Sequence, residues 1–211
     1  TLARDLGFTL EAGGMTAGGA LHLGRTMPMV AAMVLCGFAA GRWGKRRTLG
    51  GSVLLMAVGL ALCAAAPVYG VLLVALMLAG LGEGTVEGLG TPFVADLHLE
   101  EPGRYINFSH AFWSVGVFFT VLLSGVLLSM GVSWRLLVGG VAALALIPTL
   151  MLLLPARKGH EYPEHPEPLS WKTVGAHTLD IARRPRFWLF FAAMFVAGGG
   201  EFCLTFWSAS Y

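Results

Sequence analysis

Four side chains that could carry a proton or bind a polar solute stand within two otherwise apolar stretches of the sequence. Glu83 and Glu87 lie in the first stretch, and Asn107 and His110 lie in the second. A charged side chain at the centre of a bilayer costs at least about 2.5–3.5 kcal/mol on insertion scales, so an acid kept there suggests ion or substrate handling. A carboxylate can exchange a proton, whereas amide and imidazole groups can hydrogen-bond hydroxyls. These residue types indicate proton exchange beside a polar binding site.

The spacing of the two acids predicts that they share one face of a helix. Glu83, Glu87 and Thr91 follow one another at four-residue intervals, which brings them onto one stripe of a helix. We expect this stripe to face a polar cavity, which Asn107 and His110 on the next segment could also line. Because the acids are one turn apart, they could titrate as a coupled pair.

Glycines form a second stripe on the same predicted helix, about a quarter-turn from the acids. Gly80, Gly84 and Gly88 are also four residues apart. Small residues at this spacing let another helix approach closely within a membrane. We therefore expect the glycine stripe to pack against a neighbouring helix.

The elements that position these residues are expected to be membrane-spanning helices. The chain has 56% hydrophobic and 12% charged residues, and its mean hydropathy is +0.72, whereas charged residues make up about a quarter of soluble domains. Its apolar runs reach or approach the roughly 20 residues that a helix needs to cross the hydrocarbon, and no alternating segments typical of a barrel are visible. The fold class is therefore predicted to be an all-α membrane protein. The expected spans are 14–38, 48–66, 70–95, 106–130, 134–154 and 187–211.

The positive charges predict how the chain is oriented in the membrane. Most of the 14 Lys and Arg residues fall in alternate connections between the apolar runs, and Arg4 is the clear exception outside them. Lys and Arg accumulate in cytoplasmic loops, so residue 1 is expected outside. The loops expected in the cytoplasm are 41–48, 96–105 and 155–186.

Arg25 is a further charge inside an expected span. Roughly ten residues, or about 15 Å of helix, separate it from either end of the span, which is too far for easy snorkelling. Two interpretations stay open: Arg25 bonds backbone carbonyls or lines a wet crevice, or it pairs with an acid such as Glu83. Glu83 is accordingly either a structural partner or a second proton site beside Glu87.

Several other kinds of site are not expected. The three cysteines each lie inside an expected span without CxxC spacing, which favours reduced packing thiols over a disulfide or zinc framework. Neither HExxH nor GxSxG occurs, so an intramembrane enzyme is not expected. The partners expected are the lipid bilayer and a small-molecule substrate, without a cofactor, metal or nucleic acid.

The segment from Gly37 to Arg47 resembles the loop motif of the major facilitator superfamily, Gly-x-x-x-Asp-Arg-x-Gly-Arg-Arg, which joins the second and third helices of that family. Gly41 departs from the motif, because the family usually has Asp there. The resemblance implies that the first apolar run is the second helix of the family and that the chain is a fragment that lacks the first. The residues that match the gating loop are Gly37, Arg42, Gly44, Lys45 and Arg46.

The resemblance also implies a domain organisation. Residues 1–154 would form an N-terminal six-helix half lacking its first helix, and residues 187–211 the first helix of a C-terminal half. Between them, residues 155–186 would be a cytoplasmic linker, in which 170–182 reads as an amphipathic helix with Trp171 as its interfacial anchor.

Three further patterns resemble the fucose and glucose/galactose proton-symporter branch of this superfamily. They are Glu87-x4-Pro-Phe-Val, Asn107-x-x-His110-x-Phe-x-Ser-x-Gly, and a pattern around Glu201 in the last apolar run. The resemblance implies that Glu87 carries the coupled proton and that Asn107, His110 and Glu201 contact substrate. Trp113 could offer its aromatic face to a sugar, or it could simply pack against lipid or another helix.

The expected function is proton-coupled symport of a small polar solute by alternating access in the cell membrane, and the resemblance to that branch implies that the solute is a sugar. The alternatives left open are a uniporter, a carrier of an organic anion, an amino acid or a drug in the same superfamily, and a non-transporting membrane scaffold or sensor. A drug/proton antiporter would be expected to carry a Gly-Pro motif in the fifth helix, which is absent between Gly116 and Gly125.

Overall fold

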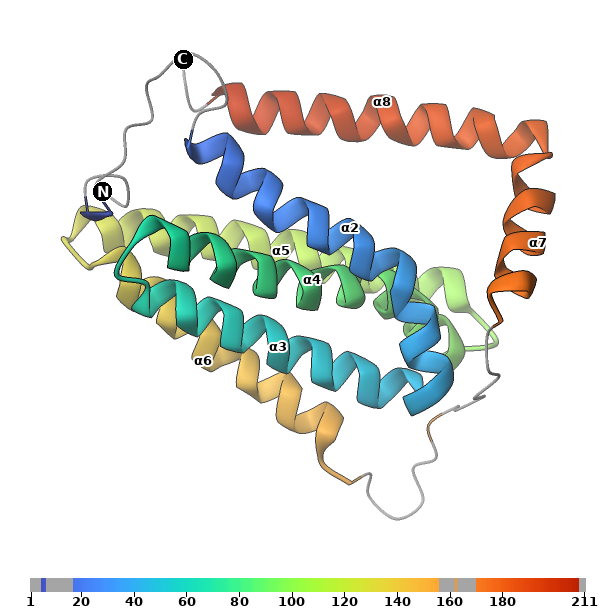
Figure 1. Ribbon diagram of the computed structural model, residues 1–211, viewed down its shortest axis with the longest axis horizontal. Helices are drawn as coiled ribbons and strands as arrows, with labels where there is room; N and C mark the ends of the chain where they lie inside the picture. Colours follow the sequence, from blue (N-terminus) through green and yellow to red (C-terminus); the bar gives the residue numbers. More distant parts are fainter. Residues whose placement is uncertain (1–4, 7–16, 156–161, 163–169, 209–211) are drawn as a thin grey trace. The chain divides into compact units, whose positions relative to one another are not determined.

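The computed structural model describes residues 5–6, 17–155, 162 and 170–208, with side chains in the last helix described as far as Gly200. All the regular elements in this part of the chain are helices, and five of them are long and apolar enough to cross a membrane. The all-α membrane fold predicted from the sequence is therefore confirmed. In chain order the helices are α2 Ala17–Trp43, α3 Lys45–Ala65, α4 Tyr69–Leu97, α5 Pro102–Ser129, α6 Trp134–Leu153, α7 Trp171–Ala182 and α8 Pro185–Ser208 (Figure 1).

The chain forms two compact units. The first, Thr1–Pro168, contains α2 to α6, and the second, Leu169–Tyr211, contains α7 and α8. In the first unit α4 lies between α2 and α3, α6 covers the other side of α3, and α5 lies against α4 (Figure 1). The predicted helix that carries both acids is thus the central element of its unit.

The connection between α2 and α3 is shorter than predicted. A loop over 41–48 was expected, but α2 continues to Trp43 and α3 begins at Lys45, which leaves Gly44 alone between them. Gly44 has a φ of 82°, a left-handed conformation that glycine adopts without steric cost. Arg and Lys are good helix formers, so the charged residues on either side extend the helices and do not open a loop.

The glycine stripe of α4 packs against α2, as predicted. A Cβ atom added at Gly80 would lie 2.2 Å from the Arg25 carbonyl oxygen, and one added at Gly84 would lie 1.9 Å from that of Met29. These distances are far inside van der Waals contact, so only glycine lets the two backbones come this close. The same approach continues one turn further on, at Gly88.

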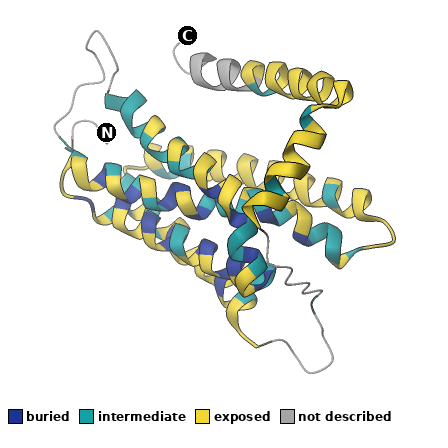
Figure 2. Cartoon of the chain, turned by 45° about the vertical axis from the view of Figure 1, so that its right-hand side comes forward, coloured by how far each residue is buried: buried dark blue, intermediate teal, exposed yellow. Residues whose placement is uncertain are grey.

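A second close approach, on the α3 side of α4, was not predicted. A Cβ atom at Gly82 would lie 2.5 Å from the Ser52 carbonyl oxygen, and one at Gly59 of α3 would lie 2.5 Å from the Ala79 nitrogen. The buried residues gather where these helices meet, whereas α5 has no buried residue (Figure 2). The core therefore holds α4 firmly on two sides and leaves its α5 side open.

Candidate functional site

Arg25 and Glu83 form an ion pair between α2 and α4. Arg25 Nε donates to Glu83 Oε2 at 2.8 Å, and Arg25 Nη2 donates to Glu83 Oε1, so the contact is bidentate. The glycine stripe brings α2 close enough for this pair, because Gly80 packs on the backbone of Arg25 itself. Of the two interpretations of Arg25, the structure therefore shows the second, in which Arg25 pairs with Glu83.

Glu87, one turn further along α4, lies in a different environment. It is exposed and makes no hydrogen bond or ion pair with the described residues. It lines a pocket of about 350 Å³ between α4 and α5. The pocket is lined by Val86, Glu87, Gly90, Thr91, Val94, Ser109, His110 and Trp113.

The α5 side of this pocket matches the predicted site only in part. His110 and Trp113 line it, and so does Ser109, which the sequence analysis missed. Asn107 does not line it, because at about 100° per residue it lies roughly a third of a turn from the direction of Trp113. The four-residue spacing of Ser109 and Trp113 is the signal that could have identified Ser109.

The α4 side of the pocket combines polar and small residues. Glu87 and Thr91 face it from successive turns, and Gly90 leaves open space, since a Cβ atom there would have nothing within 4 Å. A free carboxylate, two hydroxyls, an imidazole and an indole therefore surround one cavity. Such a site can exchange a proton at Glu87 and can hydrogen-bond a small polar molecule that also meets an aromatic wall.

Some predicted residues lie outside the described part of the chain. The backbone of α8 includes Glu201, whose side chain lies outside the described residues. For Arg4, for residues 14–16 of the predicted span at 14–38, and for linker residues 156–161 and 163–169, the backbone also lies outside the described part.

The predicted loop motif lies where several helices of the first unit end. Lys45 forms an ion pair with Asp96 near the end of α4, and Arg46 Nη2 donates to the Leu154 carbonyl at the end of α6. The Arg46 guanidinium also lies 4.5 Å from the ring centroid of Tyr162. Gly37 is half-buried, and Arg42 is exposed.

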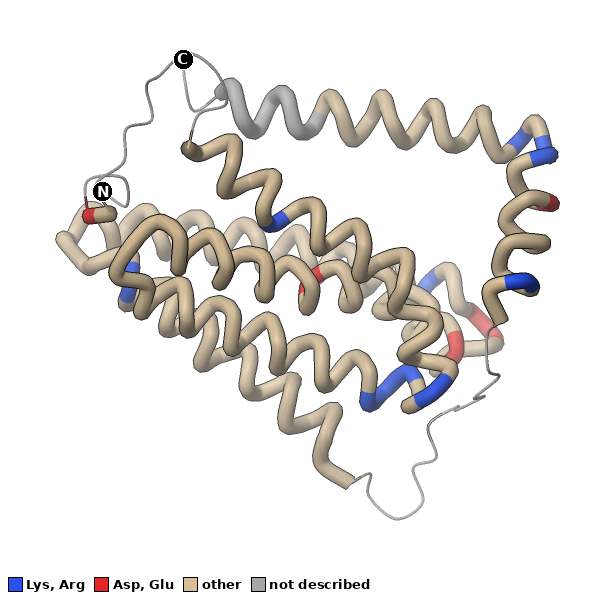
Figure 3. The backbone as a smooth tube through the Cα atoms, viewed as in Figure 1, with Lys and Arg blue, Asp and Glu red and all other residues tan. Residues whose placement is uncertain are grey.

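These contacts belong to a wider pattern of charge. The α2–α3 and α4–α5 connections lie at the same end of the first unit, where most of its charged residues gather (Figure 3). The described exceptions are Arg25 and the two acids at the middle of α2 and α4, and Asp5 and Arg135 at the opposite end of the unit. The Lys- and Arg-rich end is the one that the sequence predicts to be cytoplasmic.

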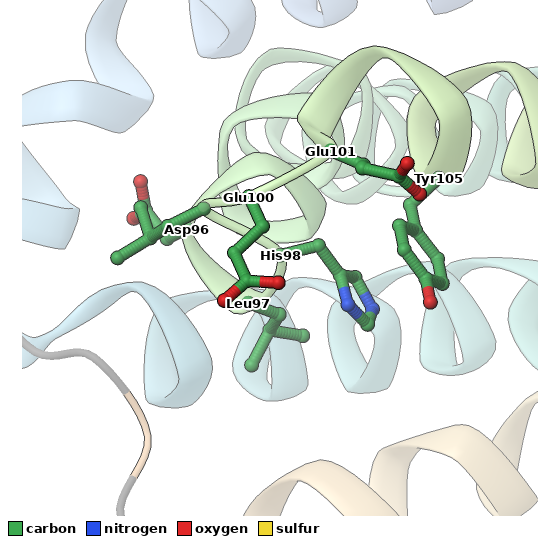
Figure 4. A pocket seen from close by; sticks show the side chains of 7 residues that line it. Asp96, Leu97, His98, Glu100, Glu101 and Tyr105 are labelled. Atoms are coloured by element: carbon green, nitrogen blue, oxygen red, sulfur yellow. The ribbon is translucent and has the colours of Figure 1, made fainter.

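A second pocket of about 400 Å³ lies at this end, in the turn between α4 and α5 (Figure 4). His98 stacks on Tyr105 there, with ring centroids 3.5 Å apart, beside Glu100 and Glu101. Glu101 is paired with Arg104 at 2.8 Å. None of the predicted proton or substrate residues lines this pocket, and no group of three or more metal-binding side chains occurs in the described part of the chain. The first pocket, lined by Glu87, His110 and Trp113, is therefore the better candidate site.

Five candidate membrane-spanning helices, with ionisable residues at mid-length in α2 and α4, define a polytopic membrane protein. A sequence model of the Major Facilitator Superfamily matches residues 1–211. The chain belongs to this superfamily and is a membrane transporter. Searches of the curated proteins and of the solved structures give no match.

Proposed function

We propose that this transporter moves a small polar solute, most simply a sugar, by proton-coupled symport with Glu87 as the proton carrier. The observation that carries the proposal is the contrast between the two acids of α4: Glu83 is held by Arg25, whereas Glu87 pairs with none of the described residues and faces the pocket with His110 and Trp113. A proton carrier has to gain and lose its proton during the cycle. An acid held in a bidentate pair with arginine is poorly suited to that, because protonation would break the pair.

The other residues of the pocket supply recognition in this proposal. His110, Ser109 and Thr91 offer hydrogen bonds to hydroxyls, and Trp113 offers an aromatic face to a sugar ring. Asn107 and Glu201 remain proposed substrate contacts by resemblance to the symporter branch. The glycine contacts and the Arg25–Glu83 pair hold α4 in place while the pocket opens to one side of the membrane or the other.

The experiment compares two variants in the intact transporter. Glu87→Gln keeps the size and hydrogen bonding of the side chain but cannot cycle a proton, so sugar exchange should persist while uphill, proton-driven uptake is lost. His110→Ala should weaken binding at least tenfold and leave coupling intact. Proteoliposomes with a trapped pH indicator, a panel of labelled hexoses and an imposed pH gradient measure both. Glu100→Gln, an exposed acid outside the pocket, is the control.

The outcomes separate the parts of the proposal. Normal uphill accumulation by Glu87→Gln would remove Glu87 from coupling. Saturable uptake that is independent of the pH gradient would indicate a uniporter. Uphill uptake driven by a sodium gradient in place of the proton gradient would indicate a sodium symporter. If no hexose moves but another solute class does, the sugar assignment is wrong. A chain that moves none of these solutes would be a scaffold or sensor.

Orientation in the cell membrane is a separate proposal, supported by the positive charges at one end of the first unit. We place this end in the cytoplasm, so a cysteine at Arg47 should react only with reagent on the cytoplasmic side. A cysteine at Met130, an exposed residue between α5 and α6, should react only from outside. Labelling of both positions from the same side would contradict this orientation.

A further inference from the structure

We propose that α7 lies flat in the headgroup region of the bilayer, at the surface where α8 enters, and that the arginines that follow it bind anionic phospholipids. The inference concerns the second unit alone and does not depend on which solute is transported. It rests on the apolar face of α7, on the corner between α7 and α8, and on the charges at that corner.

The helix α7 has one apolar face and one polar face. At about 100° per residue, Trp171, Val174 and Ile181 fall on one side, together with Leu179 at its edge. Thr178 also lies on this side, with its hydroxyl donating to the Val174 carbonyl at 2.8 Å. The opposite side carries the polar residues Lys172, Thr173, His177 and Asp180. Leu179 and Ile181 expose 54% and 48% of their surface, so these two apolar side chains of the face are open to the surroundings.

A fixed corner joins α7 to α8. Only two residues separate the helices, and Trp188 Nε1 in the first turn of α8 donates to the Ala182 carbonyl at the end of α7, at 2.8 Å. Arg184 is held to Asp180 at 2.7 Å, and the Phe187 nitrogen donates to the Arg184 carbonyl at 3.0 Å. These bonds satisfy groups of both helix ends, so the corner is defined by specific contacts.

The angle between α7 and α8 determines how α7 lies relative to the bilayer. Figure 1 shows α7 running crosswise to α8. Residues 187–200 of α8 carry no charge, as expected of a helix that enters hydrocarbon. When α8 crosses the bilayer, α7 must therefore run along its surface, the position that an amphipathic helix with a tryptophan adopts in a membrane interface.

The charges at the corner identify the lipid. Arg183, Arg184 and Arg186 fall within four consecutive positions and are exposed. Asp180, bound to Arg184, is the one acid of α7. The net charge at the corner is therefore positive, and a basic cluster beside a spanning helix attracts anionic headgroups. A zwitterionic surface would accept the apolar face, but its net charge is zero, so it would attract this basic cluster less strongly than an anionic surface.

The test measures depth with nitroxide labels on the intact transporter in nanodiscs, in a background where the native cysteines are replaced. Labels at Val174→Cys and Thr173→Cys report the apolar and polar faces of adjacent positions. We expect the Val174 label to collide mainly with oxygen, which concentrates in lipid, and the Thr173 label mainly with a water-soluble nickel chelate. Their collision ratios should differ at least threefold, more so with phosphatidylglycerol than with phosphatidylcholine alone.

Each outcome decides the proposal. Replacing Arg183, Arg184 and Arg186 with Gln should abolish the effect of phosphatidylglycerol and leave the contrast between the two labels. Persistence of the lipid effect in that variant would overturn the role of the arginines. Equal exposure of both labels to the nickel chelate would show α7 in water, and protection of the Val174 label from both reagents would show it packed against protein. Either result would overturn the proposal.

Discussion

Two faces of α4, one packed and one open, use the same residue types for opposite purposes. On the side of α2, Gly84 lets the backbones touch and Glu83 is closed into an ion pair. On the side of α5, Gly90 faces empty space and Glu87 has no partner among the described residues. Glutamate and glycine therefore have no fixed role in this helix, and the packing of each face decides what they do.

This difference divides stability from function along one helix. Changes on the α2 side should alter the free energy of unfolding, because they disturb close backbone contacts and a bidentate pair. Changes on the α5 side should leave the fold intact and alter transport, because that side packs loosely around a pocket. Mutations made in matched pairs, one on each face, test the division directly.

The largest effect is expected at Gly84. Alanine normally stabilises a helix by roughly 0.5–1 kcal/mol relative to glycine. At Gly84, however, the added Cβ would lie 1.9 Å from the Met29 carbonyl oxygen, a backbone atom that cannot rotate away. We expect Gly84→Ala to lower the free energy of unfolding by about 3 kcal/mol, the upper part of the usual range for overpacking. Unfolding of the detergent-solubilised protein in increasing dodecyl sulfate measures it.

Gly90→Ala is the matched control, on the same helix but on the open face. Since nothing lies within 4 Å of its Cβ position, this change should be neutral or slightly stabilising. Equal losses of stability in both variants would mean that the two faces do not differ in the way the structure indicates.

The sequence predicted the packing role of the glycine stripe more fully than any other contact of α4. Gly80, Gly84 and Gly88 predicted a helix contact, because small residues repeated every four positions let another helix pack closely in a membrane. The identity of the neighbour, α2, could not be predicted, since any apolar helix accepts such a stripe. The second contact was missed because Gly82 approaches Ser52 and Gly59 approaches Ala79, and each partner lies on the other helix, far away in the sequence.

The site was predicted less completely than the fold, and the cause is the register between α4 and α5. The sequence identified Glu87 and His110 from their chemistry, and both line the pocket. Which other α5 residues join them depends on how that helix is rotated. The sequence does not reveal the rotation, because apolar residues lie on most sides of α5 and form no single stripe. Asn107 was therefore included and Ser109 left out.

A smaller effect is expected from the Arg25–Glu83 pair. Arg25→Gln leaves the carboxylate of Glu83 with no cation, and Glu83→Gln leaves the guanidinium of Arg25 with no anion. Each should cost about 2 kcal/mol, within the usual range for hydrogen bonds to charged groups, and less than a fully buried pair because both side chains are partly exposed. The double variant should recover at least half of the summed loss, as measured in the same unfolding assay.

Glu87→Gln is the matched control on the other face and should leave the free energy of unfolding unchanged within about 0.5 kcal/mol, since it breaks no contact in the described structure. Simple additivity of Arg25→Gln and Glu83→Gln would argue that the two side chains do not interact in the membrane.

The smallest effect should come at Gly88, where the stripe meets a side chain. A Cβ atom there would lie 2.5 Å from Cys36 Sγ and 3.0 Å from the Met33 carbonyl oxygen, so the nearest obstacle is a sulfur and not the backbone. Gly88→Ala should therefore cost about 1 kcal/mol, less than Gly84→Ala. Cys36→Ala removes the sulfur and its 3.0 Å hydrogen bond to Met33. In that background the cost of Gly88→Ala should fall by at least half, because contacting residues couple by about 0.5 kcal/mol or more in double-mutant cycles. An unchanged cost would mean that the Met33 carbonyl, and not Cys36, limits the approach of the two helices.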